Sequence, residues 1–379
     1  MRSCWNRQTG MFEGHVSQDV RVQVPLTAPY IIEKAVFILR ECFVIKIKRL
    51  FIFISCTCFL YGNFGIVDAK DLDLLNTKVY LTGNGIATRL HKPVLEGFPN
   101  INIEFIHLSE ELSKTNDLVV PSNSWLFLGT PVYKHKQHIL GCAGTCKNIL
   151  CEKPVGLSTF EIDQIKKSIS QNQVLFIVNY ALRFLPCVER IREFIKNNDV
   201  KSITITCNTN FNQNPPNKPW KDNYKLGGGV LYSILPHMID LLNYLNFQEN
   251  LSDITFQSTA QVPMNDIQLN SKTLSGVNTV INIDLCKNFD ELTLKIETSD
   301  KSTTFDLVDV SENRISNTKY CNGTLFATSK ISPWRISFKY LLKSLFTSPQ
   351  PQDSRFANIE DAENVLKVLD VILLQQKTQ

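Results

Sequence analysis

Two residues in this sequence have side chains suited to moving protons and stabilising negative charge: a lysine in CEKP and a histidine in GGGVLYSILPHMIDLL. Oxidation of an alcohol by hydride transfer needs a base for the hydroxyl proton, and histidine suits that task near neutral pH. A lysine ammonium beside the developing alkoxide would stabilise it electrostatically. Lys153 and His237 have side chains of these two types.

The histidine belongs to a segment, residues 230 to 245, whose pattern predicts a helix that begins after the glycines 227 to 229. Glycine is about 1 kcal/mol less favourable than alanine in a helix, so the run indicates positive φ or close approach to a ligand or a neighbouring strand end. Apolar residues form a stripe on the predicted helix, and Ser233, His237 and Asp240 share its other face. Ser233 and Asp240 are candidate substrate contacts.

Two further residues could contact a substrate, and each also has a simpler explanation. Arg183 follows the stretch VLFIVNYAL and could hold a substrate oxygen or carboxylate in a bidentate fork, or form a surface ion pair. Trp220 lies in a loop rich in proline and asparagine, where it could form an apolar wall against a sugar or anchor the loop. His135 and His138 have the spacing of a metal pair, but no set of carboxylates or cysteines accompanies them, so no metal site is expected.

The stretch TKVYLTGNGIATRL suggests a dinucleotide-binding turn, because an apolar strand is followed by Gly83-x-Gly85 and a helical pattern. In a Rossmann unit the first glycine permits the tight turn, the second lets the backbone approach the pyrophosphate, and a third small residue allows close helix packing. Thr88 stands at the third position, so the fingerprint is incomplete. The candidate cofactor-binding residues in this turn are Gly83, Gly85, Ile86 and Ala87.

The second strand of the unit, in the stretch INIEFIHLSEEL, should end at the acidic residue that binds the ribose 2′-hydroxyl of NAD. The strand-end positions are His107, Leu108 and Ser109, and Glu110 lies just beyond them. No arginine is adjacent that would favour a 2′-phosphate. Ser109 is kept as a candidate cofactor contact, and the choice between NAD and NADP stays open.

Short apolar strands then alternate with helical patterns through SWLFLGTPVYKHKQHIL, NILCEKPVGLSTFEIDQIKKSI and QVLFIVNYALRFLPCVERIREFI. This rhythm predicts an α/β fold with a parallel, doubly wound sheet, and ligands bind such sheets at the carboxyl ends of the strands. Those ends are GTP, CEKP and NYALRF. The further candidate cofactor-binding residues are Thr130, Pro131, His135, Glu152 and Lys153.

Five stretches, GNGIATRLHKP, LFLGTPVYKHKQHI, ILCEKPVGLS, VNYALRFLP and GGGVLYSILPHMIDLL, resemble in order and spacing the glucose-fructose oxidoreductase / inositol dehydrogenase / rhizopine catabolism (Gfo/Idh/MocA) family. The resemblance implies a Rossmann domain followed by an α+β domain with a large, open, mostly antiparallel sheet, often used for dimer or tetramer contacts. It also implies a nicotinamide cofactor, NAD or NADP. The implied reaction is hydride transfer at a hydroxyl or keto carbon of a sugar, cyclitol or nucleotide sugar.

In such proteins the lysine of the EKP motif touches the reacting hydroxyl, and the histidine after the glycines donates or accepts a proton, so the resemblance implies these roles for Lys153 and His237. Ser233 is a departure, because many members carry an aspartate there and serine cannot act as a carboxylate. Two alternatives therefore stay open. One is a non-catalytic protein that binds the cofactor for structure or regulation, and the other is a lyase or hydrolase that uses a tethered cofactor without net redox change.

The same motifs suggest the domain boundaries. We expect a Rossmann domain over residues 75–185 and an α+β substrate and oligomerisation domain over 186–350. A C-terminal helix over 351–379 is expected to pack back on the Rossmann domain. Residues 1–74 are not expected to belong to the fold.

The first 74 residues contain two unusual stretches. Residues 4–25 resemble the conceptual translation of a leucine transfer-RNA gene, since RVQVP back-translates through a T-loop sequence. The stretch LFIFISCTCFLY, preceded by KIKR, imitates a signal peptide but is shorter than the roughly 20 apolar residues that span a bilayer, and it starts deep in the chain. We therefore expect synthesis to start at Leu75, if a TTG codon encodes it. A real membrane anchor or signal is the competing interpretation.

The composition points to a globular protein with a small-molecule partner. Its 379 residues suffice for two or three domains, and 40 basic and 36 acidic side chains give a net charge of +4, so nucleic acid is not an expected partner. Eleven cysteines occur without a CxxC pair, which favours reduced thiols and a cytoplasmic location. We expect a homodimer or homotetramer without a membrane partner, because an open sheet with an exposed face is prone to aggregate unless another subunit covers it.

Overall fold

The structure is a computed structural model that describes residues 77–108, 120–210, 219–258, 265–307, 318–319, 332–347 and 353–378. The expectations for residues 1–74, including the transfer-RNA-like stretch, the signal-like stretch and a start at Leu75, lie outside these ranges. Ser109 also lies outside them. Within the described ranges, no helix is long and apolar enough to cross a membrane.

In the described part of the chain, five parallel strands form the first sheet, in the order β2-β1-β3-β4-β5. They are β1 Thr77–Thr82, β2 Ile101–Phe105, β3 Trp125–Leu128, β4 Asn148–Cys151 and β5 Leu175–Val178. This sheet confirms the predicted doubly wound fold. Its strand order reverses between β1 and β3, the place where such folds bind ligands.

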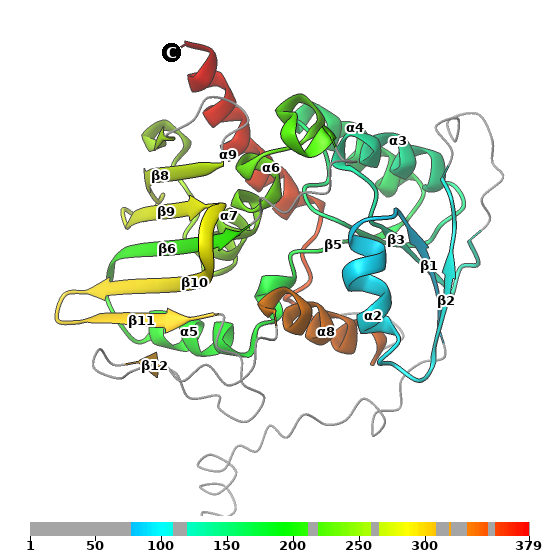
Figure 1. The fold of residues 1–379 in the computed structure, drawn as a ribbon, viewed down its shortest axis with the longest axis horizontal. Helices are drawn as coiled ribbons and strands as arrows, with labels where there is room; N and C mark the ends of the chain where they lie inside the picture. Colours follow the sequence, from blue (N-terminus) through cyan, green and yellow to red (C-terminus); the bar gives the residue numbers. More distant parts are fainter. Residues whose placement is uncertain are drawn as a thin grey trace, which may run out of the picture. The chain divides into compact units, whose positions relative to one another are not determined.

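Helices cover both faces of this sheet (Figure 1). They include η2 Ala87–His91, α2 Lys92–Leu95, α3 Val132–Cys142 and α4 Thr159–Gln171, whereas η3 Ala181–Phe184 and α5 Pro186–Lys196 follow β5 and lead to the second sheet. The side chains of β3 alternate between two cores: Phe127 packs with residues of the later helix α8 Pro333–Phe346, whereas Leu126 and Leu128 belong to the core on the other face. Burial on both faces explains why the strands are short, continuous apolar runs.

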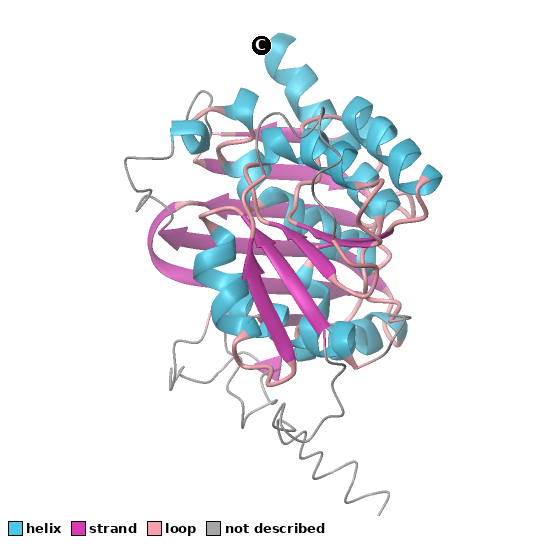
Figure 2. Ribbon diagram, turned by 90° about the vertical axis from the view of Figure 1, so that its right-hand side faces the viewer, coloured by secondary structure: helices cyan, strands magenta, loops and turns pink. Residues whose placement is uncertain are grey.

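The second sheet has seven strands among the described residues, in the order β12-β11-β10-β6-β9-β8-β7. Figure 1 labels most of these strands, and Figure 2 draws the strands of both sheets in magenta. They are β6 Val200–Asn210, β7 Thr255–Gln257, β8 Asp266–Lys272, β9 Asn278–Asp284, β10 Cys286–Thr298, β11 Ser302–Asp306 and β12 Thr318–Lys319. Every neighbouring pair is antiparallel except β6 and β9, which are parallel. The predicted large, mostly antiparallel sheet is confirmed.

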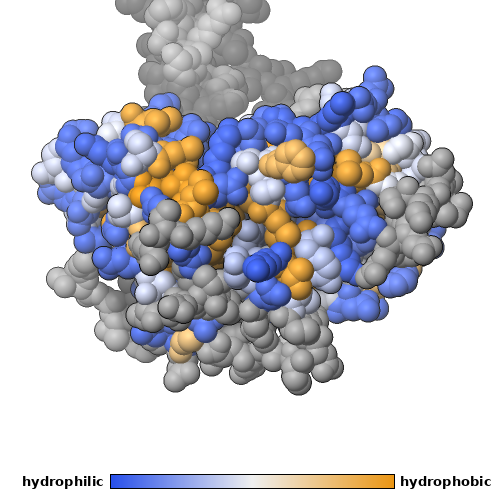
Figure 3. Space-filling model, turned by 90° about the horizontal axis from the view of Figure 1, so that it is seen from above, coloured by the Kyte–Doolittle hydropathy of each residue, from blue (hydrophilic) through white to orange (hydrophobic). Residues whose placement is uncertain are grey.

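One face of the second sheet is apolar and buried, and its other face is polar. In β8, for example, Ile267 and Leu269 are buried, whereas the alternate residues Gln268 and Asn270 are not. In the view of Figure 3, hydrophilic residues cover most of the coloured surface and apolar residues gather in separate patches. The exposed side chains of β8 are therefore polar, and an apolar face that a second subunit would have to cover is not seen there. The homo-oligomer stays a prediction.

The predicted single helix over residues 230 to 245 is two helices, α6 Val230–Ser233 and α7 Leu235–Tyr244. The backbone between them turns at Ile234, whose φ is −117°. The physical reason is Pro236, because proline lacks the N–H that a continuous helix would bond to the preceding turn. The break separates Ser233 from the helix that carries His237.

The last helix, α9 Ile359–Thr378, lies against both α4 and α7. Its Asp370 accepts a hydrogen bond from the Thr159 hydroxyl at 2.8 Å, and Lys166 of α4 donates to Glu363 at 2.8 Å. Three short 3₁₀ segments, η4 Pro219–Asp222, η5 Tyr224–Leu226 and η6 Leu251–Asp253, complete the described helical elements. The C-terminal helix thus connects elements on both sides of the expected domain boundary.

Candidate active site

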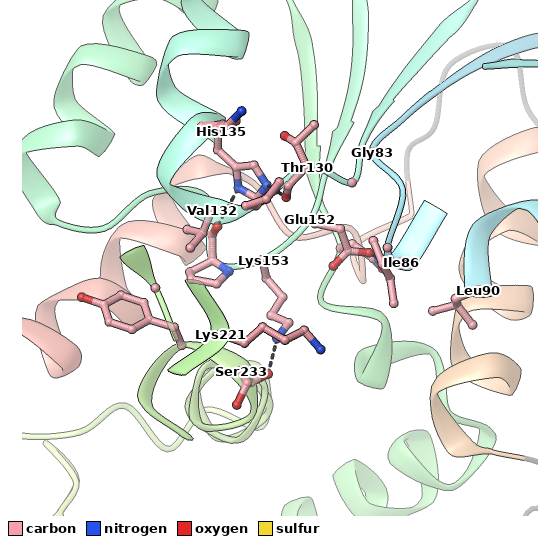
Figure 4. A pocket seen from close by; sticks show the side chains of 18 of the residues that line it. Gly83, Ile86, Leu90, Thr130, Val132, His135, Glu152, Lys153, Lys221 and Ser233 are labelled. Atoms are coloured by element: carbon pink, nitrogen blue, oxygen red, sulfur yellow. Dashed lines mark hydrogen bonds between the residues drawn. The ribbon is translucent and has the colours of Figure 1, made fainter. Parts of the chain in front are cut away.

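A cavity of about 1090 Å³ lies where the carboxyl ends of β1 to β5 meet the glycine run, α6, α7 and the start of α8 (Figure 4). Its position at the reversal of strand order is the one that doubly wound sheets use for ligands. Among the residues that we proposed for the site, those on its wall are Gly83, Gly85, Ile86, Thr130, Pro131, His135, Glu152, Lys153, Trp220, Ser233 and His237. The fold thus brings together residues that are more than 150 positions apart in the chain.

The glycine turn after β1 is built for close approach between strand ends. Gly83 has φ +89°, and a Cβ placed on it would lie 2.3 Å from the carbonyl oxygen of Gly129, so no other residue fits there. The Thr82 hydroxyl donates to the Phe127 carbonyl at 3.1 Å and accepts from the Gly129 N–H at 3.3 Å. Ala87 is fully buried beneath the turn instead of lining the cavity. A small residue there permits the close packing that the third position of the Rossmann fingerprint serves.

Glu152 is the centre of a hydrogen-bonded group at the floor of the cavity. Its Oε1 lies 2.7 Å from Nε2 of His91 and accepts from Nδ2 of Asn179 at 2.6 Å. Burial by itself would raise the pKa of Glu152, but the bond and the charge of His91 bring that pKa below its usual value. The His91 ring also stacks on Phe338 of α8, with ring centroids 4.7 Å apart. The carboxylate is therefore ionised and held by the elements that follow β1 and β5.

Lys153 follows the end of β4 and extends toward the C-terminal end of α6. Its Nζ donates a hydrogen bond to the backbone carbonyl of Ser233 (Figure 4). Burial lowers the pKa of Lys153 to about 8, and the charge of Glu152 opposes that shift. The Ser233 hydroxyl turns away and donates to the Gly229 carbonyl at 2.7 Å. The lysine is thus a cation near neutral pH whose partner here is a backbone carbonyl.

His237 lies on α7 and is only 8% exposed, although it lines the cavity. Its ring packs against Trp334 of α8, with centroids 4.5 Å apart, and meets the edge of Tyr180 at 6.2 Å. Nδ1 of His237 is buried and has no hydrogen-bond partner in the described structure. Burial, followed by the charge of Lys153, lowers the pKa of His237 well below its usual value. A neutral imidazole with an unpaired nitrogen on a cavity wall can accept a proton.

Parts of the chain are similar in sequence to known proteins, and its fold is similar to solved structures. The family model for the oxidoreductase family C-terminal alpha/beta domain, GFO_IDH_MocA_C, matches residues 192–266. Glucose-6-phosphate 3-dehydrogenase of Bacillus subtilis is 26% identical over 187 residues, 44% of this chain and 53% of that protein. Residues 192–266 therefore resemble the C-terminal domain of this oxidoreductase family, and the similarity to glucose-6-phosphate 3-dehydrogenase covers part of each chain.

Two further similar proteins, one by sequence and one by fold, differ in their named activities. The 2,7-anhydro-N-acetylneuraminate hydratase of Escherichia coli is 28% identical over 123 residues, 32% of each chain. The structure of levoglucosan dehydrogenase in complex with NADH and levoglucosan shares the fold, with a TM-score of 0.63 at 15% identity over 80% of this chain and 97% of that one. The chain spans about half the length, or less, of the curated relatives that it matches.

His135 joins the loops after β3 and β4. Its Nε2 lies 2.8 Å from the Thr130 carbonyl oxygen, and its Nδ1 lies 2.9 Å from the Pro154 carbonyl oxygen. The Thr130 hydroxyl also lies 3.0 Å from Nδ1 of His138. Both histidines are buried in these contacts, and among the described residues no group of three or more histidine, cysteine or acidic side chains could hold a metal ion. His135 therefore positions the loop that carries Lys153.

Arg183 and Asp240 are away from the cavity wall and bind each other. Arg183 donates to both carboxylate oxygens of Asp240, at 2.9 and 2.5 Å, and its Nη2 lies 3.1 Å from Asp361 of α9. The two side chains are 3% and 1% exposed. Burial by itself would lower the pKa of Arg183, but the neighbouring carboxylates raise it above its usual value. This geometry gives no support to substrate contact by either residue, because both are fully used in holding η3, α7 and α9 together.

The three glycines serve contact within the protein, at one wall of the cavity. A Cβ on Gly227, whose φ is +83°, would lie 1.8 Å from Val132 of α3, and one on Gly228 would lie 2.2 Å from the Lys221 carbonyl oxygen. Gly229 has φ +78°. The run therefore packs the loop of Trp220 against the start of α6. From the sequence we expected the glycines to approach a ligand or a neighbouring strand end. The residue that Gly227 meets, Val132, lies at the start of α3, shortly after the end of β3.

Several residues on the wall were not proposed from the sequence. Trp334 and Phe338 come from α8, and Asn179 from the end of β5. A polar residue directly after an apolar strand is a signal that could have indicated Asn179. No comparable signal marks Trp334, because an aromatic residue at the start of a helix is common in ordinary cores.

Proposed function

We propose that the protein is an NAD(P)-dependent oxidoreductase that acts on a hydroxyl or keto carbon of a sugar, cyclitol or nucleotide sugar. The observation that carries the proposal is the shared cavity wall, which both Lys153 and His237 line next to the end of the first sheet. The names of glucose-6-phosphate 3-dehydrogenase and levoglucosan dehydrogenase support a CH–OH substrate. A cytoplasmic location and an assembly of two or four copies stay predictions.

The residues of the cavity fit a nicotinamide dinucleotide. The volume is at the upper end of the roughly 300–1000 Å³ found for small-molecule sites. Asn179 and His237 both line the cavity, and each has a buried polar atom without a hydrogen-bond partner in the described structure. The residues that would hold the cofactor are Gly83, Gly85, Ile86, Thr130, Pro131, Asn179, Glu152 and Lys153. When bound, the nicotinamide supplies the site that accepts or donates the hydride.

The protonation states of the two catalytic candidates suit alcohol oxidation. Because the pKa of Lys153 is about 8, the ammonium predominates at neutral pH and stabilises negative charge on the substrate oxygen. Because the pKa of His237 is well below its usual value, the imidazole is neutral and can take up the hydroxyl proton. In the reverse direction the same two groups would supply a proton to the carbonyl oxygen. Ser233 does not contribute a charge to either step.

A second candidate is a hydratase or lyase that uses the bound cofactor transiently. The 2,7-anhydro-N-acetylneuraminate hydratase supports it, because its identity to this chain is similar to that of the dehydrogenase. The third candidate is a non-catalytic cofactor-binding protein. It agrees with the serine at position 233 in place of a carboxylate, but it does not explain why His237 lines the cavity beside Lys153. Net change in cofactor absorbance on addition of substrate separates the first candidate from the other two.

The test begins with fluorescence titrations of the full chain with NADH and with NADPH, followed by a screen of sugars, sugar phosphates and inositols for cofactor reduction. The variant His237→Phe retains a ring against Trp334 and removes both nitrogens, so it should bind cofactor and lose turnover. Substrate conversion without net cofactor reduction would favour the second candidate. If neither cofactor binds to the folded protein, the enzyme assignment fails.

A further inference from the structure

The end of the cavity beside β2 carries a basic pair that the sequence did not reveal. Arg89, from the helix that follows the glycine turn, lines this end together with Phe105 and His107. Leu81 pairs with Phe105, and the Ile106 N–H donates to the Leu81 carbonyl at 2.9 Å, so the pairing of β1 with β2 continues beyond the strand. Extended by two positions from Leu81 and Phe105, this register would set His107 opposite Gly83.

This register indicates which part of a dinucleotide His107 would contact. In Rossmann proteins that bind NAD, a carboxylate at the end of the second strand accepts a hydrogen bond from the ribose 2′-hydroxyl, and in those that bind NADP an arginine nearby accommodates the 2′-phosphate. Here the position level with the glycine turn is a histidine. As expected from the sequence, no arginine is adjacent to His107 along the chain; Arg89, 18 positions earlier, lines the same cavity.

Arg89 is a cation on the cavity wall, and Lys92 lies 3.6 Å from the carboxylate of Glu96. Lys92, one turn after Arg89, places its Nζ 5.9 Å from the centroid of the Phe105 ring. Glu104 of β2 is paired with Lys78 at 2.5 Å. Among the described residues on the cavity wall, the one carboxylate is Glu152, which lies at the end of β4 and is bonded to His91 and Asn179.

We propose that the β2 end of the cavity binds the 2′-phosphate of NADP, with Arg89 as the main ligand and His107 in the place of the NAD-type carboxylate. A planar guanidinium can donate two parallel hydrogen bonds to a phosphate, which a ribose hydroxyl cannot accept equally well. The inference rests on the proposed function, since it names the cofactor of that same site. It makes the protein an NADP-preferring member of its family.

The first experiment measures equilibrium binding without substrate, by fluorescence titration of the full chain with NADPH and NADH and by calorimetry with 2′,5′-ADP and ADP. A charge-assisted contact predicts that NADPH and 2′,5′-ADP bind about 10-fold to 100-fold tighter than their counterparts. Equal or tighter binding of NADH overturns the inference and leaves the proposed function intact. Failure of both dinucleotides to bind removes the proposed function, and the inference with it.

Two variants locate the contact. Arg89→Ala should weaken NADPH binding by about 10-fold or more and leave NADH within about 3-fold. Arg190→Ala, a change at an exposed arginine of α5 outside the cavity wall, is the matched control and should change neither affinity. His107→Asp should shift the preference toward NADH, because a carboxylate repels the 2′-phosphate and accepts from the 2′-hydroxyl. Equal losses for both cofactors in Arg89→Ala would place the arginine elsewhere on the dinucleotide and overturn the inference.

Discussion

His237 and Asp240 lie one turn apart on the same helix, α7, and both are buried, yet their surroundings differ completely. Asp240 accepts two hydrogen bonds from Arg183, so its polar atoms are satisfied within the protein. His237 has a buried nitrogen without a partner in the described structure. Since buried polar groups are normally paired, the unpaired one is where a ligand is expected. Burial alone does not distinguish the two residues.

The two buried cations repeat this contrast. Arg183 is bound by the carboxylates of Asp240 and Asp361, whereas Lys153 has no acidic side chain within ion-pair distance in the described structure and donates to a backbone carbonyl. The pKa of Arg183 is raised by its partners, and the pKa of Lys153 is lowered by burial. The ion pairs of Arg183 therefore stabilise the fold, whereas the Lys153 ammonium can still interact with a negatively charged group of a ligand. Variants of the two clusters should change different properties.

Removing the cation of the paired cluster should have the largest effect on stability. Arg183→Met leaves Asp240 as a buried carboxylate without a partner, which is expected to lower the free energy of unfolding by about 3–5 kcal/mol. The measurement is urea denaturation followed by fluorescence. The double variant Arg183→Met with Asp240→Leu should recover part of the loss, because it removes the uncompensated charge. Single and double variants of equal stability would contradict the structural role of the pair.

His237→Phe should lower turnover without lowering stability, in contrast to Arg183→Met. Loss of a general base lowers turnover by about 10²-fold to 10⁴-fold, whereas the free energy of unfolding should stay the same or rise, since an unpaired buried nitrogen is removed. The comparison requires turnover, cofactor affinity and thermal unfolding of the same protein preparation. A large loss of stability with unchanged turnover would show that His237 is a core residue like Asp240.

Lys153→Met tests the unpaired cation by two measurements. Turnover should fall by about 10²-fold to 10³-fold, as when one electrostatic stabiliser of an oxyanion is removed. The pKa of Lys153 is about 8 in the folded protein, below its unfolded value of about 10.4. The charge therefore destabilises the fold fully below pH 8, and this penalty disappears as the pH rises toward the unfolded value.

The variant should accordingly be more stable than the parent at pH 7, and the difference should shrink between pH 8 and 10. Thermal unfolding across that range measures it, with Lys343→Met, a change outside the cavity wall, as the control. A stability difference that does not vary with pH would contradict the lowered pKa.

The sequence predicted the features that depend on neighbours along the chain. The parallel strands, the turn at Gly83 and the lysine after β4 all follow from local patterns, and the structure contains each of them. The contrast between His237 and Asp240 could not be predicted in this way, because Arg183 lies 57 positions from Asp240 and both residues carry ordinary polar side chains. A pattern of residue types shows which side chains share a helix, but not which of them finds a partner.

The parts of the site that come from distant segments were missed for the same reason. Trp334 reaches the cavity because α8 packs against η3 and α2, contacts that join segments about 150 to 240 positions apart. The break at Ile234 was also missed, since the apolar stripe continues across it and only the single residue Pro236 indicates a boundary. Arg89 was also missed, because its place on the cavity wall beside the end of β2 depends on how β1 and β2 pair in space.

The smallest predicted effect concerns Ser233, whose carbonyl accepts the hydrogen bond from Lys153. Ser233→Asp places a carboxylate near the ammonium, and an opposite charge at such a distance raises a lysine pKa by about 1 unit or more. If the ammonium form is required, kcat/KM of the parent falls above about pH 8, and the variant keeps its activity to higher pH. At pH 7 the two proteins should differ by less than about 2-fold, because Lys153 is already mostly protonated there. Ser233→Asn, which has nearly the same shape without charge, should keep the parent's profile. An equal shift in both variants would mean that the lost serine contact, and not the charge, governs the alkaline limb.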